Sequence, residues 1–123
     1  MTLNLRSERN LQGVHRDLVK VVRRAEQKVP FIVTEGLRTV ARQKQLVAAG
    51  ASQTMNSRHL TGHAVDVAAL VDGEVRWDWP LYARIAVEMK AAAKDLGVPI
   101  FWGGDWKSLK DGPHFELDRK KYP

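Results

Sequence analysis

Cysteine is absent from the 123 residues, and this absence removes several classes of function at the outset. Without thiols the chain cannot build a disulfide-stapled scaffold, a thiolate zinc finger or a cysteine nucleophile. Any metal ion must therefore be held by histidine, aspartate or glutamate. Only four histidines are present, so a metal site would draw on a short set of candidates.

Long apolar runs are missing too. No stretch approaches the roughly 20 apolar residues of a membrane-spanning helix, and residues 1–6 lack the apolar core and cleavage site of a secretory signal peptide. The chain has no internal repeat and no linker rich in proline, glycine or serine. Because 44% of the residues are hydrophobic, we expect one domain with its own core over residues 1–123.

Acidic residues are outnumbered, with 14 Asp and Glu against 20 Lys and Arg, for a net charge of +6. This balance favours polyanionic partners, which include nucleic acids, anionic membrane surfaces and acidic wall polymers. It equally suits an ordinary solvated surface. The sequence lacks the basic aromatic strands, glycine-rich clamps and Cys/His fingers of nucleic-acid modules, so we expect no nucleic-acid partner.

Apolar spacing predicts about three helices. The first covers residues 8–28, where apolar side chains recur at steps of three and four, and Ser7 is placed to cap its start. The second runs to residue 48 after Thr39, another capping residue. The third covers residues 80–96, with an apolar stripe along one side.

Short runs of apolar and β-branched residues predict strands between and after these helices. The predicted strands are residues 31–34, 64–71, 75–77, 100–102 and 114–117. An Asp-Gly pair separates the second and third strands and predicts a hairpin. Because helices and a hairpin are mixed irregularly, we expect an α+β domain with a small antiparallel sheet.

The residues that carry chemistry begin with an aspartate in an apolar strand. Asp66 is flanked by valines, and a carboxylate buried there is costly unless it is paired or binds a metal. One interpretation is an ion pair with one of the many arginines. The other is a metal ligand, which is favoured because His59 lies seven residues earlier across a turn that contains Gly62.

A third candidate ligand lies near the end of the chain. His114 opens a predicted strand, and Asp111 precedes it by three residues across a Gly-Pro turn. Two histidines and one carboxylate, with a fourth position open, form a common catalytic zinc site. Zinc lowers the pKa of a bound water to about 7, and a nearby carboxylate such as Asp111 can accept the proton.

Three neighbours of these residues have two interpretations each. His63 follows His59 by four residues, but a leucine stands where the zinc-binding helix of other peptidases has glutamate, so we interpret His63 as a loop residue. Glu116 either orients His114 or pairs with a surface lysine. Trp106 either lines a groove for an extended substrate or packs in the core.

Three segments form a longer pattern, in the order Glu35-Gly36-Leu37-Arg38-Thr39-x-x-Arg42-Gln43-x-x-Leu46, then Ser57-x-His59-x-x-Gly62-x-Ala64-x-Asp66, then Asp111-x-x-His114. The pattern resembles the zinc D-alanyl-D-alanine carboxypeptidase family of peptidoglycan peptidases. The closer likeness is to phage L-alanyl-D-glutamate endopeptidases, which act as endolysins. This resemblance implies a Hedgehog/DD-peptidase-like domain.

The resemblance also implies a role for individual residues. Zn²⁺ would be held by His59, Asp66 and His114. Asp111 would be the general base and then the acid, and Arg38 would face the scissile carbonyl or a substrate carboxylate. An ion pair with Glu35 or Asp66 is the other interpretation of Arg38. Ser57 would help to position the substrate, together with a groove wall at Trp106. The family's dipeptidases and many of its carboxypeptidases carry glutamate in place of Asp111, whereas endolysin-like members carry aspartate.

The activity implied by this resemblance is zinc-dependent hydrolysis of the L-alanyl-D-glutamate bond in the stem peptide of peptidoglycan, which contributes to cell lysis. The alternative is a D-alanyl-D-alanine carboxypeptidase or dipeptidase of the same family. Because Hedgehog domains keep a zinc site on the same fold, a non-catalytic zinc-binding wall module is a third reading.

Further expectations concern partners and location. Peptidoglycan stem peptides are the expected partners, with added attraction between the basic surface and the anionic envelope. We expect a monomer without a separate cell-wall-binding domain. By analogy with other single-domain endolysins, we expect synthesis in the host cytoplasm without a signal peptide and action on the cell wall in the periplasm.

Overall fold

The computed structural model describes residues 5–52, 55–107 and 110–123. In chain order the elements are α1 (Leu5–Asn10), α2 (Arg16–Glu26), β1 (Phe31–Glu35), α3 (Val40–Ala48), the 3₁₀ turn η1 (Arg58–Thr61), β2 (Ala64–Val71), β3 (Glu74–Arg76), α4 (Trp79–Leu96), β4 (Ile100–Trp102), the 3₁₀ turn η2 (Gly103–Asp105) and β5 (His114–Leu117). The expected α+β class is confirmed.

One antiparallel sheet joins all five of these strands. Its order is β1-β2-β5-β4, and β3 pairs with the far end of β2. The predicted strands 64–71, 100–102 and 114–117 match in both bounds, and the other two differ by one residue. The hairpin turn places Asp72 at φ 53° and Gly73 at φ 80°, the left-handed conformation that a two-residue hairpin turn requires.

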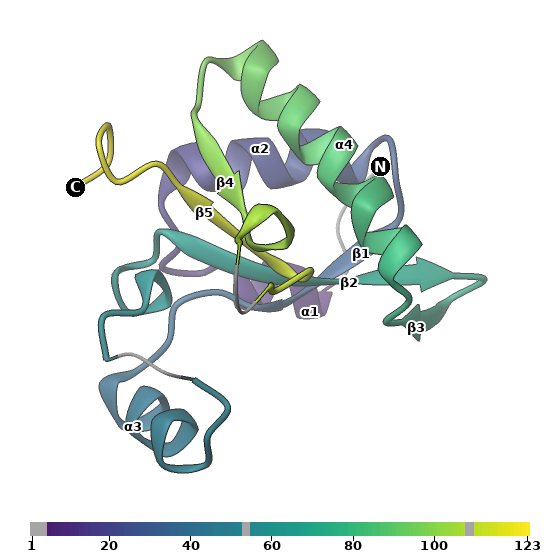
Figure 1. Ribbon diagram of the computed structural model, residues 1–123. Helices are drawn as coiled ribbons and strands as arrows, with labels where there is room; N and C mark the ends of the chain where they lie inside the picture. The colour runs from purple at the N-terminus through teal and green to yellow at the C-terminus, as the bar shows by residue number, and fades with distance from the viewer. Residues whose placement is uncertain (1–4, 53–54, 108–109) are drawn as a thin grey trace.

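The hydrophobic core lies on one face of this sheet. Helices α2 and α4 pack against each other there, and Figure 1 shows them together on one side of the sheet while α3 is set apart from it. Successive side chains of a strand point to opposite faces. Val65 and Val67 of β2 therefore join Leu18 and Ile85 in the core, whereas Asp66 belongs to the opposite face.

The predicted helix over residues 8–28 is wrong, because the chain forms two helices with a bend between them. The bend includes Gly13, which adopts φ 83°, a conformation that favours glycine. Leu11 and Val14 remain buried on either side of it, which is why their apolar spacing passes through the break unchanged. The apolar spacing therefore predicted correctly which residues are buried, but it did not show that the helix is interrupted.

The predicted helix cap at Ser7 is also wrong. Ser7 lies inside α1, and its buried hydroxyl accepts a 2.9 Å hydrogen bond from the backbone N–H of Val33, which ties α1 to β1. The cap of α2 is His15, whose Nδ1 accepts from the backbone N–H of Asp17 at 3.0 Å. An imidazole nitrogen here takes the place that a serine or aspartate oxygen usually has.

The other two predicted helices are confirmed. Thr39 caps α3 by accepting a 3.1 Å hydrogen bond from the backbone N–H of Arg42. Helix α4 carries its proline in the first turn and is capped after Leu96 by Gly97, which adopts φ 69°. In the described part of the chain, no helix combines the length and the apolar character needed to cross a bilayer.

Candidate active site

A groove of about 850 Å³ opens on the face of the sheet that carries Asp66. Its walls come from β1, η1, β2, β5 and the segments around α3 and Trp106. All of the site residues predicted from the sequence line it: Arg38, Ser57, His59, Asp66, Trp106, Asp111 and His114. The fold therefore gathers three distant segments of the sequence at one place.

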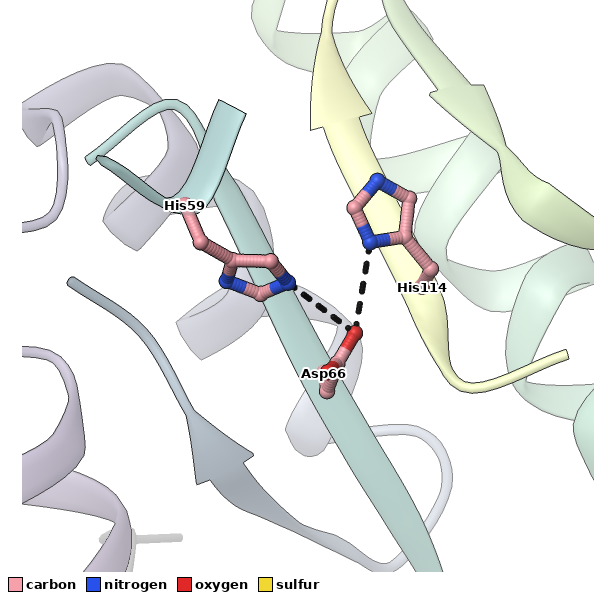
Figure 2. Close-up of side chains that lie close together, drawn as sticks. All are labelled: His59, Asp66 and His114. Carbon is pink, nitrogen blue, oxygen red and sulfur yellow. Dashed lines mark hydrogen bonds and ion pairs between the residues drawn. The ribbon is translucent and has the colours of Figure 1, made fainter. Parts of the chain in front are cut away.

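Three side chains converge at the centre of this groove. His59 comes from η1, Asp66 from β2 and His114 from β5, and Figure 2 shows them pointing toward one another. One ligand atom from each lies within 4.8 Å of the other two. Asp66 Oδ1 is 3.3 Å from His59 Nε2 and 3.3 Å from His114 Nδ1. The register between β2 and β5 brings two of these three residues together, because it pairs Asp66 with His114 directly.

The second nitrogen of each histidine is held by another group. His59 Nδ1 donates a 2.8 Å hydrogen bond to the carbonyl of Gly36, and His114 Nε2 donates a 2.8 Å hydrogen bond to Glu116 Oε1. These bonds leave His59 Nε2 and His114 Nδ1 facing Asp66, so these are the nitrogens that would bind a metal once any proton on them has left. Of the two interpretations of Glu116, orientation of His114 is the one found. Imidazole nitrogens and a carboxylate in this arrangement suit Zn²⁺.

The charges within the cluster reinforce one another. Burial alone would raise the pKa of Asp66, but hydrogen bonds from His114 and His59 outweigh it and lower that pKa below its usual range. Burial alone would lower the pKa of His114, but hydrogen bonds to Asp66 and Glu116 raise it to about 9. Without a metal, His114 therefore carries a proton between two carboxylates at neutral pH, and a cation bound there takes the proton's place.

Asp111 lies on the wall of the groove beside these ligands. Burial, and then the charge of Asp66, raise the pKa of its carboxyl. The turn that carries it is fixed on two sides. Its own N–H donates to the carbonyl of Gly103 at 3.1 Å, and the buried Trp102 indole donates to the carbonyl of Gly112 at 2.7 Å. A Cβ on Gly103 would lie 2.3 Å from the Asp111 carbonyl oxygen, so glycine is required for this approach.

Arg38 makes the ion pairs that one interpretation of the sequence expected. Its Nε lies 2.5 Å from Glu35 Oε1, and its Nη2 lies 3.8 Å from Asp66 Oδ2. Its Nη1 also donates to Gln43 Oε1 at 2.7 Å. The same guanidinium lines the groove, so these contacts fix it in a position where it can meet a substrate. The buried amide of Gln43 was part of the motif, but sequence reasoning gave it no role.

Ser57 and Trp106 each contact a residue that carries a candidate ligand, which the sequence alone did not show. The Ser57 hydroxyl accepts a 3.2 Å hydrogen bond from the backbone N–H of His59, so it caps the turn that carries a ligand. The Trp106 ring lies 5.1 Å from the His114 ring on the groove wall. His63 lies outside the groove lining, where its Nδ1 is 2.6 Å from Thr61 Oγ1.

Two arginines of the groove wall, Arg58 and Arg119, were not among the predicted site residues, although Arg58 is one of the arginines that could bind a free carboxylate in the carboxypeptidase alternative. Arg58 occupies an unassigned position of the central motif, directly before His59, and Arg119 follows β5. The one sign in the sequence that they could line the site was their position next to segments that carry candidate ligands. Nothing in the spacing showed that they share one wall.

Comparison with known proteins identifies relatives over almost the whole chain. A family model described as "Phage L-alanyl-D-glutamate peptidase" matches residues 1–122. The L-alanyl-D-glutamate peptidase of Escherichia phage T5 is 35% identical over 122 residues, which cover 94% of this chain and 88% of that protein. The peptidoglycan L-alanyl-D-glutamate endopeptidase CwlK of Bacillus subtilis (strain 168) is 32% identical over 108 residues, covering 76% of this chain and 64% of that protein.

Two solved structures also superpose on this chain. The L-Ala D-Glu endopeptidase ChiX of Serratia marcescens superposes with a TM-score of 0.94 at 56% identity, covering all of this chain and 94% of that one. The vancomycin resistance D,D-dipeptidase VanXYg superposes with a TM-score of 0.55 at 20% identity, covering 85% of this chain and 50% of that one. The second likeness concerns the fold alone.

Proposed function

Because this chain belongs to the phage L-alanyl-D-glutamate peptidase family, we propose that it hydrolyses the L-alanyl-D-glutamate bond of peptidoglycan stem peptides with a bound Zn²⁺. The family expected from the sequence is thereby confirmed. The observation that carries the proposal is the convergence of His59, Asp66 and His114 in a groove. The ring nitrogen of each histidine that faces away from Asp66 is already hydrogen-bonded to another group of the protein.

The residues of the chain supply the parts of an amide hydrolysis. When bound to the three ligands, Zn²⁺ supplies a Lewis acid that polarises the scissile carbonyl and activates water. Asp111 stands beside the ligands with a raised pKa, which suits a group that accepts a proton from water and passes it to the leaving amine. The Arg38 guanidinium, held by Glu35 and Gln43, provides donors for the negative charge that develops on the carbonyl oxygen.

The comparisons support the endopeptidase over the carboxypeptidase and the non-catalytic wall module. The relatives named above are L-alanyl-D-glutamate peptidases, and the D,D-dipeptidase likeness is limited to the fold. We propose that the chain acts at the bacterial cell wall, where the net charge of +6 attracts it to anionic stem peptides.

The test is mass spectrometry of purified peptidoglycan digested with the protein, with and without a zinc chelator. We expect fragments with a new D-glutamate N-terminus, and we expect the chelator to abolish them. Release of D-alanine alone would assign a carboxypeptidase. Absence of cleavage by zinc-loaded protein would leave a binding module.

A matched pair of histidine variants ties the activity to the metal site. His59→Ala should lose both zinc and cleavage, because a ligand is removed. His63→Ala should keep both, because His63 lies outside the groove lining. Zinc retained in stoichiometric amount by His59→Ala would contradict the ligand set.

A further inference from the structure

We propose that Arg58 and Arg119 form a carboxylate-binding subsite of the groove, which recognises the α-carboxylate of the D-glutamyl residue on the leaving side of the scissile bond. This inference rests on the proposed function, because that carboxylate belongs to the stem peptide. It adds a determinant of substrate choice to the metal ligands and the general base.

The two arginines both line the groove, and they lie close enough for the charge of Arg119 to act on Arg58. Arg58 is in η1 directly before the ligand His59, and Arg119 follows β5, which carries the ligand His114. Both line the groove together with Glu116, which is hydrogen-bonded to His114. The pair is therefore close to the metal ligands without belonging to them.

The charge of Arg58 is poorly compensated. Its side chain lines the groove, yet the residue is only 8% exposed. Among the described residues, no carboxylate forms an ion pair with it and its Nε has no hydrogen-bond partner. Arg38, another buried cation of the groove, has Glu35 and Asp66 beside it. A buried charge without a counterion is costly, and an anionic ligand relieves that cost.

Glu116 does not neutralise the pair, because its carboxylate is already shared. Its Oε1 accepts the hydrogen bond from His114, and its Oε2 lies 3.8 Å from Arg119 Nε. Burial and then the charge of Arg119 lower the pKa of Arg58, and the opposing effect of the Glu116 charge does not outweigh them. The two guanidinium groups therefore repel each other. The single Glu116 carboxylate therefore faces two guanidinium groups, which leaves positive charge for a substrate anion.

A purely structural role explains only part of this arrangement. Arg58 Nη2 donates to the backbone carbonyl of Tyr122, which ties the chain end to η1. That bond uses one of five guanidinium N–H groups. It does not account for the position of Arg58 on the groove wall next to a second arginine.

The chemistry of the substrate selects which carboxylate meets this wall. The α-carboxylate of D-glutamate is attached to the same carbon as the nitrogen released by hydrolysis, so it must lie near the reacting centre. Guanidinium groups bind carboxylates through paired N–H donors. An α-amide at the same position has no charge and offers only one acceptor oxygen, so the subsite distinguishes the two forms.

The test compares two synthetic stem peptides that differ only in having the α-carboxylate or the α-carboxamide of D-glutamate. The zinc-loaded wild type should prefer the carboxylate in kcat/KM by about tenfold or more. Arg119→Ala and Arg58→Lys should each reduce that preference toward unity, with zinc content unchanged. Arg84→Ala, which removes an exposed arginine of α4 outside the groove, should keep the wild-type preference.

Several outcomes would overturn the subsite. Equal cleavage of both peptides by the wild type, or an unchanged preference in both arginine variants, removes it. Loss of the preference in Lys110→Ala alone moves recognition to that exposed groove lysine and also overturns the assignment. Failure of the wild type to cleave either peptide between L-alanine and D-glutamate contradicts the proposed function itself, which distinguishes the two failures.

Discussion

The Nε2 atom of His114 donates a 2.8 Å hydrogen bond to Glu116 Oε1, and this bond determines which ring nitrogen faces Asp66. The two residues are two positions apart in β5, so their side chains share one face of the strand. Glu116 thus holds Nε2 of a candidate ligand from within the same strand, so that Nδ1 is the nitrogen left for a metal.

We predict that Glu116→Gln weakens zinc binding by about tenfold or more, because the charged acceptor that orients His114 is lost. Competition with a fluorescent zinc chelator measures the affinity. Glu74→Gln, an exposed substitution in β3, is the matched control and should leave the affinity unchanged. Equal affinities in the two variants would show that Glu116 does not support the metal.

Zinc affinity should depend on pH through the same histidine. The pKa of His114 is about 9 in the metal-free chain, so a proton must leave when the metal binds. The apparent affinity should therefore rise by up to about tenfold per pH unit as the pH increases toward 9, and fall as it decreases. Chelator competition between pH 6.5 and 8.5 checks the slope. A flat profile would mean that His114 binds no proton that the metal displaces.

Asp111→Asn should keep the metal and lose turnover by about 10²- to 10⁴-fold, because an amide cannot accept the proton. Zinc content and the cleavage rate of stem peptides are measured on the same preparation. Asp105→Asn, an exposed change outside the groove, serves as the control. Turnover near that of the wild type would remove Asp111 from the mechanism.

Trp102→Phe tests the hydrogen bond that holds the turn carrying Asp111. The indole of Trp102 donates to the Gly112 carbonyl in a buried position, and phenylalanine leaves that carbonyl unpaired. The free energy of unfolding should fall by about 1–3 kcal/mol, as measured by denaturant titration. Trp77→Phe, at a largely exposed tryptophan, should change it far less. Similar losses in both variants would show that the indole hydrogen bond is not the cause.

Strand positions were predictable from the sequence because the buried strands are short, continuous apolar runs. The apolar run on both sides of Asp66 gave β2 its bounds and showed that a carboxylate lay in an apolar setting. The break between α1 and α2 was missed because Leu11 and Val14 are buried whether or not the helix continues. Gly13 within the predicted helix was the only local sign of it.

The metal ligands could be predicted from residue type and order, but their supporting contacts could not. The partner of His59 is the backbone carbonyl of Gly36, and a carbonyl has no residue signature. The shared wall of Arg58 and Arg119 arises only when η1 and the end of β5 come together in space. Such contacts depend on tertiary packing, which apolar periodicity does not report.

The two faces of β2 contribute to different parts of the protein. Val65 and Val67 belong to the hydrophobic core, whereas Asp66 lines the groove. A change in the charge of the groove wall therefore leaves the core contacts intact. One scaffold of this kind can be adapted to walls whose D-glutamate is free or amidated by exchanging a few wall side chains. Under the proposed subsite, the choice between the two forms of D-glutamate would depend on these groove side chains and not on the residues that form the core.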